Sequence, residues 1–325
     1  MKPSLSSETG TVVTRCAAIL RKAQGLLVIT GAGISAESGM PTYRGCGGLY
    51  EKNPEYTSTL SAAGLAHEPE KIWKHIDDLR VRAAAAQPNP AHRILAQWER
   101  ERRFCRFLIA TQNIDGLHQK AGSNRVTELH GSVWQMACPL SVDFAEDDQL
   151  SRDANDLISL ENREEVLCRW SQENNHTVWE DREVPFASIP PYRDTDVRPN
   201  VVFFNENYGN RLLWVEDFIR RTPDAVLVIG CSGGVSIVDR LLRNCRDANP
   251  GCAIINVNTY EDFINLSHLH IPMPATAAME ALHAMLETAP GHETAIDTET
   301  HPLQDPSSKT GSMNEQSQVK RWAGD

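Results

Sequence analysis

The chain has 325 residues, of which 41% are hydrophobic and 23% charged, and its formal net charge at pH 7 is −11. At about 150 residues per domain, this length predicts one large domain or two smaller ones. The composition is typical of a globular protein and excludes collagen-like, low-complexity and wholly disordered classes. No uncharged run approaches the roughly 18 apolar residues of a membrane span, and an acidic surface repels nucleic acid. We therefore expect neither a membrane nor nucleic acid as a partner.

Eight cysteines are scattered along the chain, and none forms a C-x-x-C pair. In a reducing compartment such cysteines are mostly small buried residues rather than disulfides or metal ligands. The N-terminal segment lacks the continuous apolar core and small-residue cleavage site of a secretory signal. Together these features predict a cytoplasmic protein.

Apolar residues at helical spacing from Thr11 to Gln24 predict a helix, which is followed by an apolar strand at residues 26–29 and a glycine turn. Further short apolar runs lie at residues 107–110, 201–204, 226–229 and 253–257. Amphipathic stretches lie among them at residues 68–84, 91–103, 211–221 and 236–247. Strands that alternate with helices predict an α/β fold, a doubly wound, Rossmann-like parallel sheet covered by helices on both faces.

The stretch from residue 137 to 198 breaks this alternation. Between Ser141 and Glu183 it carries thirteen Asp or Glu against four Arg and no Lys. We interpret it as a small inserted acidic module within a Rossmann-like domain formed by residues 11–136 and 199–286. Residues 287–325 are poor in apolar side chains and are predicted to be a disordered tail. The acidic module is either a solubilising surface or an attractive surface for Lys-rich protein segments.

The first candidate site is the turn Gly31-Ala32-Gly33, which follows an apolar strand and leads into a short helix near Ser35. Glycines allow backbone N–H groups to approach a pyrophosphate, and a helix start presents further donors. A plain tight turn is the alternative. The loop from residue 41 to 50 follows, and in it Arg44 is suited to phosphate and Tyr43 to covering a flat ring. An ordinary surface loop is the alternative here.

Two further clusters follow predicted strands. Gln112, Asn113 and Asp115 lie just after residues 107–110, at the strand end where doubly wound sheets bind ligands. An Asn and an Asp two residues apart can pair with a carboxamide and a ribose hydroxyl, or can simply cap a helix. His130 follows another short apolar run, and a lone histidine is more often structural than catalytic.

These segments occur in an order that resembles the sirtuin family. The resemblance covers roughly residues 25–258 and rests on the linked segments GAGIS, PTYRG, TQNIDGLH and ELHG, which are specific together although each is weak alone. It implies an NAD-consuming enzyme in which His130 is the catalytic base and Asn113 is also catalytic. It further implies NAD contacts from Gly31, Ala32, Gly33, Ser35, Tyr43, Arg44, Gln112, Asn113, Asp115, Gly230, Ser232 and Asn256. The resemblance implies that an extended acyl-lysine peptide pairs as an added strand with Val202, Phe203, Phe204 and Asn205.

The implied reaction is protein-lysine deacylation, which yields nicotinamide and O-acyl-ADP-ribose. A dry pocket favours cleavage of the nicotinamide–ribose bond, the acyl oxygen attacks the sugar carbon, and an imidazole takes the proton of a ribose hydroxyl. Two alternatives share the same site. ADP-ribosyl transfer or NAD hydrolysis uses the same first step, and an NAD or ADP-ribose binding module would not turn over at all.

The chain departs from the family where a structural zinc site is expected. Cys138 occupies the first ligand position, but Ser141 stands where its partner belongs, and residues 191–197 contain no cysteine. A four-cysteine site is therefore excluded, and a site from Cys138, Cys168 and His176 fits no common spacing. We expect no zinc, and a small apolar core instead, formed by Val166, Trp170, Val178, Trp179 and Phe186.

Two further departures concern the substrate. Asn205 stands where the family usually has glycine, which weighs against peptide deacylation because a side chain occupies the place where peptide backbone should approach. Ile76 and Leu79 occupy the positions of a Tyr and an Arg in the members that remove acidic acyl groups, so succinyl or malonyl specificity is disfavoured.

Overall fold

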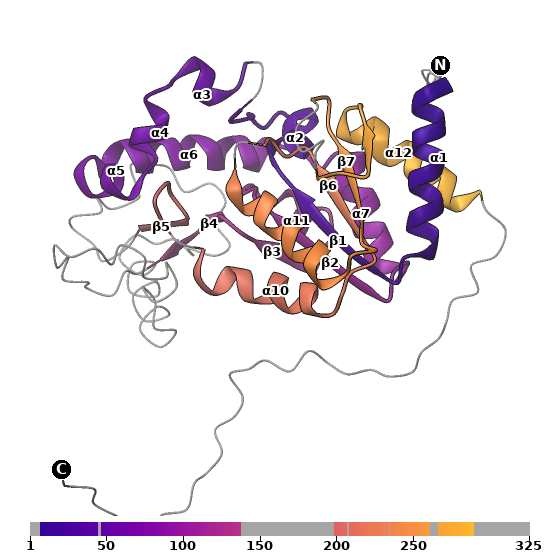
Figure 1. Ribbon diagram of the computed structural model, residues 1–325. Coiled ribbons are helices and arrows are strands. Elements are labelled where there is room, and N and C mark those ends of the chain that lie inside the picture. Colours follow the sequence, from indigo (N-terminus) through magenta and orange to yellow (C-terminus); the bar gives the residue numbers. More distant parts are fainter. Residues whose placement is uncertain are drawn as a thin grey trace, which may run out of the picture. The chain divides into compact units, whose positions relative to one another are not determined.

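The computed structural model describes residues 7–44, 47–137, 198–206, 208–233, 235–260 and 266–288. Within them, six parallel strands form one sheet in the order β3-β2-β1-β6-β7-β8 (Figure 1). The strands of the sheet are β1 (Gly25–Thr30), β2 (Arg106–Thr111), β3 (Val126–Glu128), β6 (Ala225–Ile229), β7 (Ala253–Val257) and β8 (Leu269–Ile271). This arrangement confirms the predicted doubly wound α/β fold.

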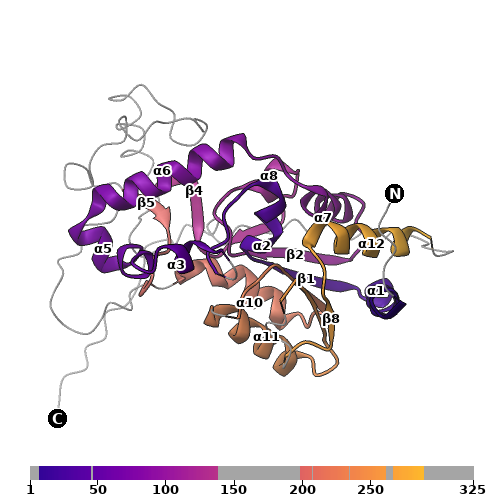
Figure 2. The same cartoon turned by 90° about the horizontal axis from the view of Figure 1, so that it is seen from above.

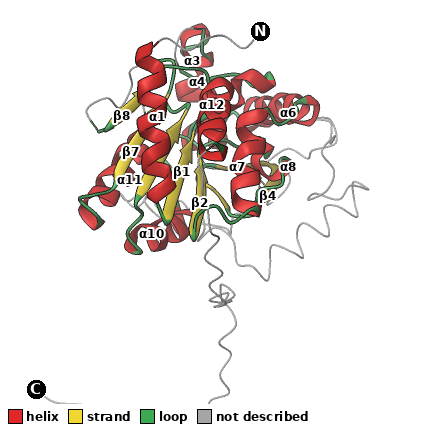
Figure 3. Cartoon of the chain, turned by 90° about the vertical axis from the view of Figure 1, so that its right-hand side faces the viewer, coloured by secondary structure: helices red, strands yellow, loops and turns green. Residues whose placement is uncertain are grey.

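Helices cover both faces of the sheet because its central strands are apolar on both faces. In β1, Leu26 and Val28 point into one core cluster and Leu27 and Ile29 into another, and all four are fully buried. Figure 3 shows the helices around the sheet. The first cluster includes residues of α1 (Ser7–Lys22), α7 (Pro90–Arg100) and α12 (Ala275–Glu287). The second includes residues of α10 (Leu213–Arg220) and α11 (Ser236–Ala248).

A smaller antiparallel pair, β4 (Gly131–Ala137) and β5 (Arg198–Val201), lies beside α6 (Figure 2). It shares a third core cluster with the helical segment formed by α3 (Leu49–Lys52), α4 (Tyr56–Thr59), α5 (Ala62–His67) and α6 (Pro69–Ala85). Arg80 of α6 donates from Nε to the Val133 carbonyl of β4 at 2.9 Å, which ties the helix to the pair. The short segments α2 (Ala32–Ser35), η1 (Ala36–Ser38), α8 (Leu117–Lys120) and η4 (Gly209–Leu212) complete the described elements.

The predicted helices and strands differ from the observed ones mainly at their ends. The helix predicted over residues 91–103 ends at Arg100, and Arg102 has a left-handed φ of 50° that a helix cannot contain. The run at residues 201–204 was predicted as a strand of the main sheet, and this is wrong. The strand ends at Val201 and pairs antiparallel with β4, and Phe204 makes only an isolated bridge to Ser61. Apolar content alone does not specify which sheet a strand joins.

The inserted acidic module and the disordered tail remain predictions. Residues 138–197 and 289–325 lie outside the described residues, and so does the apolar core expected in the module. Among the described segments, no helix combines the length and the apolar character needed to cross a bilayer.

Replacing Trp98 with alanine tests the first core cluster. Trp98 is fully buried, packs on Phe104 at 5.8 Å between ring centroids, and donates from Nε1 to His283 Nδ1 at 3.2 Å. We expect Trp98→Ala to lower the free energy of unfolding by about 3–5 kcal/mol, measured by urea denaturation. Trp214→Ala is the matched control, because Trp214 is 47% exposed, and it should cost far less. Equal losses in the two variants would contradict this picture of the core.

Candidate active site

Two glycine turns meet at the carboxyl ends of β1 and β6. Gly31 N–H donates to the Ile229 carbonyl at 3.0 Å, and Gly33 N–H donates to the Gly230 carbonyl at 2.9 Å. A Cβ at Gly33 would lie 2.6 Å from Gly230 Cα, and Gly230 itself has a φ of 61°. Side chains at these positions would push the turns apart. The contact therefore holds the ends of β1 and β6 together at one edge of the sheet, which is where doubly wound sheets bind ligands.

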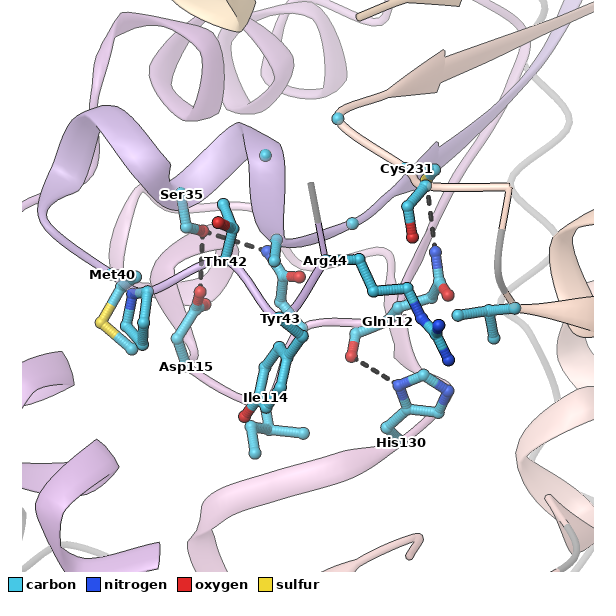
Figure 4. A pocket seen from close by; sticks show the side chains of 18 of the residues that line it. Ser35, Met40, Thr42, Tyr43, Arg44, Gln112, Ile114, Asp115, His130 and Cys231 are labelled. Atoms are coloured by element: carbon cyan, nitrogen blue, oxygen red, sulfur yellow. Dashed lines mark hydrogen bonds between the residues drawn. The ribbon is translucent and has the colours of Figure 1, made fainter. Parts of the chain in front are cut away.

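A buried polar cluster lies beside these turns (Figure 4). The Ser35 hydroxyl donates to Asp115 Oδ2 at 2.7 Å and accepts from Asn113 Nδ2 at 3.0 Å. Asp115 Oδ1 also accepts from the Leu117 N–H at 2.9 Å, so the carboxyl both caps α8 and faces Ser35. Burial raises the pKa of Asp115, and the hydrogen bonds from Leu117 and Ser35 oppose that rise. The cluster offers hydrogen-bonding groups in a setting that excludes most water.

His130 precedes β4 and lies on the other side of Gln112. Its Nδ1 is 2.8 Å from the Gln112 carbonyl, and its Nε2 is 3.4 Å from the Tyr208 hydroxyl. Gly131, the next residue, has a φ of 79°, and a Cβ there would lie only 1.9 Å from the Asn200 carbonyl oxygen of β5. Burial lowers the pKa of His130 to about 4, and nearby Arg211 acts in the same direction. The imidazole is therefore neutral at pH 7.

Two further histidines, His92 and His118, pack next to the polar cluster on the side of Ser35. His92 Nε2 lies 3.4 Å from the Ser35 hydroxyl and its Nδ1 lies 3.0 Å from Asn89 Oδ1. His118 packs edge-on against His92 at 4.9 Å between ring centroids and contacts the Thr30 hydroxyl at 3.0 Å. Burial lowers the pKa of both histidines, to about 4 for His92. The two imidazoles next to Ser35 are thus polar groups without charge at pH 7.

One cavity of about 680 Å³ joins the turns, the polar cluster and His130. With one exception, every site residue predicted from the sequence lines it, namely Gly31, Ala32, Gly33, Ser35, Tyr43, Arg44, Gln112, Asn113, Asp115, His130, Val202, Phe203, Phe204, Asn205, Gly230 and Ser232. The exception is Asn256, which is fully buried within β7 and does not line the cavity. Asn258, two residues later, does line it and donates from Nδ2 to the Cys231 carbonyl at 2.7 Å. Asn258, rather than Asn256, is thus the asparagine near the end of β7 that reaches the cavity.

Sequence reasoning missed several residues of this cavity. Tyr50 stacks at a tilt against Tyr43 and Phe204, with ring centroids 5.4 and 5.7 Å away, and these three rings form one aromatic wall. Cys231 receives a hydrogen bond from Gln112 Nε2 at 3.2 Å, and burial raises the pKa of its thiol to about 12, so the thiol is not a nucleophile. Tyr50 ends the loop 41–50 and Cys231 lies between Gly230 and Ser232, so the sequence had pointed to the neighbourhood of both. No sequence pattern pointed to Tyr208, whose hydroxyl lies near His130.

The described residues contain no group of three or more His, Cys, Asp or Glu side chains arranged to hold a metal ion. The expectation of a zinc-free module concerns Cys138, Cys168 and His176, which lie outside those residues. It remains a prediction.

The chain is similar to known proteins over most of its length. A model of the Sir2 family matches residues 31–237. The chain is 32% identical over 266 residues to the NAD-dependent protein deacylase of Aquifex aeolicus, a match that covers 80% of this chain and 95% of that protein. A structure from work on the mechanism and regulation of Sir2 enzymes is 30% identical with a TM-score of 0.64, covering 85% of this chain and 98% of the other. A Sir2 variant with a deacetylated p53 peptide and 3′-O-acetyl-ADP-ribose is 26% identical, with a TM-score of 0.62 and coverage of 85% and 98%.

Adding a methyl group at Gly33 tests the contact between the two turns. Gly33→Ala places a Cβ against the backbone of Gly230, and we expect NAD affinity to fall about tenfold or more, in line with other overpacked sites. Isothermal titration calorimetry measures the affinity, and far-ultraviolet circular dichroism checks the fold. Gly10→Ala is the control, because nothing lies within 4 Å of its added Cβ. Wild-type affinity in the Gly33 variant would show that the contact does not matter for NAD.

The lowered pKa of His130 has a consequence for stability. Between pH 6.5 and about 4 the unfolded chain binds a proton at this imidazole and the folded chain does not, so acid favours unfolding. We expect His130 to account for a loss of about 1–2 kcal/mol between pH 7 and pH 5. Urea denaturation at both pH values should therefore show a smaller loss for His130→Gln than for the wild type. If the free energy of unfolding changed equally with pH in both proteins, the lowered pKa of His130 in the folded chain would be contradicted.

Proposed function

Since this chain belongs to the Sir2 family, we propose that it is an NAD-dependent protein-lysine deacylase that releases nicotinamide and O-acyl-ADP-ribose. One observation carries the proposal, namely that the Ser35–Asn113–Asp115 cluster and His130 line the same cavity as the segment 202–205. NAD, when bound, supplies the ADP-ribosyl group that accepts the acyl oxygen as nicotinamide leaves. The chain's own groups bind NAD, orient its nicotinamide end and accept a proton from the ribose.

The residues of the cavity suit NAD. The glycine turns after β1 and β6 line the cavity at the carboxyl edge of the sheet, the place where a pyrophosphate would lie. The side chains of Asn113 and Asp115 can pair with the carboxamide of nicotinamide, because one offers an amide and the other a carboxylate acceptor. Their burial excludes competing water and strengthens each hydrogen bond. The polar cluster would thereby hold the carboxamide in one orientation.

His130 is suited to accept the proton of a ribose hydroxyl. A backbone carbonyl only accepts hydrogen bonds, so Nδ1 must carry the hydrogen that bonds the Gln112 oxygen, and Nε2 of the neutral ring keeps its lone pair. The lowered pKa keeps this lone pair available at pH 7. In this proposal Asn113 orients the nicotinamide end and His130 is the base.

The acyl-lysine peptide would lie along residues 202–205. Several N–H groups of this segment are already used, since Val202 donates to the His130 carbonyl, Phe203 to Glu206 Oε2 and Phe204 to the Leu60 carbonyl. The carbonyls of Phe203 and Phe204 also accept hydrogen bonds, from the Glu206 and Ala62 N–H groups. Strand addition by a peptide would therefore have to displace Glu206 from this segment. Ile76 and Leu79, both buried, line the cavity and favour a neutral acyl group over a charged one.

ADP-ribosyl transfer or NAD hydrolysis is the second candidate, and Asn205 favours it. Asn205 has a left-handed φ of 67°, is exposed and lines the cavity, so a side chain stands where the peptide backbone would approach. Asparagine tolerates this left-handed conformation better than most residues, which is consistent with its standing at a position where the family usually has glycine.

Two finer points belong to the same proposal. A cytoplasmic location is supported by the cysteine usage described above. A preference for Lys-rich substrate segments is supported by the acidic composition of residues 141–183 and would weaken as salt screens the attraction.

Nicotinamide release separates the candidate functions. The protein is incubated with NAD alone, with acetyl-lysine peptide and with succinyl-lysine peptide, and nicotinamide is followed by chromatography. We expect release that depends on the acetyl peptide and is slower with the succinyl peptide. Release without peptide would favour hydrolysis or transfer, and a bound but unconsumed NAD would indicate a binding module.

Replacing the base provides the direct test. We expect His130→Ala to lower peptide-dependent turnover by about 10²–10⁴-fold, the usual contribution of a general base. His67→Ala, at an exposed histidine of α5, is the control and should retain activity. If the His130 variant were as active as the wild type, another group would have to be the base.

A further inference from the structure

The Tyr208 hydroxyl lies at the free nitrogen of His130, a contact that the proposed reaction does not use. We propose that Tyr208 is a positioning residue that orients His130 and passes its proton to solvent. This inference rests on the proposed function, because it concerns the step in which His130 acts.

The geometry of the two rings supports the assignment. With Nδ1 bonded to the Gln112 carbonyl at 2.8 Å, the lone pair of Nε2 points away from that bond, and the Tyr208 hydroxyl lies 3.4 Å from Nε2. The rings stack with their centroids 5.6 Å apart and their planes inclined by 30°. The imidazole is thus held at both nitrogens and along one face. Hydrogen bonds of catalytic groups are often long before substrate binds, so 3.4 Å suits a contact that shortens later.

Tyr208 is itself fixed in place. It lies between β5 and α10, and its ring packs against the core cluster that includes Val215 and Leu212. Both Tyr208 and His130 line the cavity. A tyrosine anchored by its ring and only partly buried can hold its hydroxyl at the base while remaining within reach of water.

The proton balance of the step is simple. A ribose O–H displaces the Tyr208 O–H from the single lone pair of Nε2 and gives its proton to that nitrogen, and the ring becomes positively charged. Nε2–H then donates its proton to the Tyr208 oxygen as the phenolic proton passes to water, which restores a neutral imidazole and a neutral phenol. No electron is transferred and no further reactant is needed. Arg211 and burial both disfavour the charged imidazole, which promotes the release of the proton, and burial keeps the phenol protonated by raising its pKa.

Tyr208→Phe removes the hydroxyl and keeps the ring. Exchange of labelled nicotinamide into NAD, in the presence of acetyl peptide, reports the step before His130 acts, and we expect its rate to be unchanged. Formation of deacetylated peptide should fall in kcat by about tenfold, the effect of losing one hydrogen bond, with KM unaltered. Tyr56→Phe, at a tyrosine that does not line the cavity, is the matched control and should change neither rate.

The outcomes separate this role from a structural one. An unchanged kcat in Tyr208→Phe would overturn the inference, and so would an equal fall in exchange and turnover, which indicates damage to the site. If the wild type released no nicotinamide with any acyl peptide, the proposed function would fail instead. In that case the ¹⁵N chemical shift of His130 Nε2 still tests the contact with the Tyr208 hydroxyl. This shift should change in Tyr208→Phe and stay unchanged in Tyr56→Phe.

Discussion

The contact between the turns after β1 and β6 is the constraint on which the rest of the site depends. Gly33 and Gly230 approach so closely that neither can carry a side chain, and a backbone hydrogen bond joins them. Parallel pairing of β1 with β6 and β2 brings three strand ends to one edge of the sheet. The polar residues that follow β2 therefore lie close to the turn after β1, and the Ser35 hydroxyl joins the two segments by donating to Asp115.

Much of the fold and of the site was predictable from the sequence, because both depend on local patterns. Apolar runs between amphipathic stretches indicated the parallel sheet, and glycines or polar residues directly after those runs indicated its ligand-binding edge. The strand at residues 201–204 was misassigned because its apolar residues pack against α6 and β4 rather than the main sheet. The composition of one strand does not reveal which distant segment it pairs with.

Other features of the site were beyond sequence reasoning because they arise from three-dimensional packing. Asn256 lies inside β7 and is fully buried, whereas Asn258 follows the last residue of the strand, Val257, and lines the cavity. The sequence alone does not determine the residue at which this strand ends. The pairing of His92 with His118 joins α7 to α8, and neither residue's neighbours in the sequence indicate the other. The stack of Tyr208 on His130 likewise joins segments 78 residues apart.

The antiparallel pair of β4 and β5 begins next to His130 and closes at Ala137 and Arg198. The chain therefore leaves the neighbourhood of the cavity and returns to it at adjacent points, and Val202 N–H donates to the His130 carbonyl at the point of return. The pairing of β4 with β5 thereby holds Ala137 and Arg198 side by side. Since these two points are adjacent, a change of sequence between them need not alter the spacing of His130 and Val202.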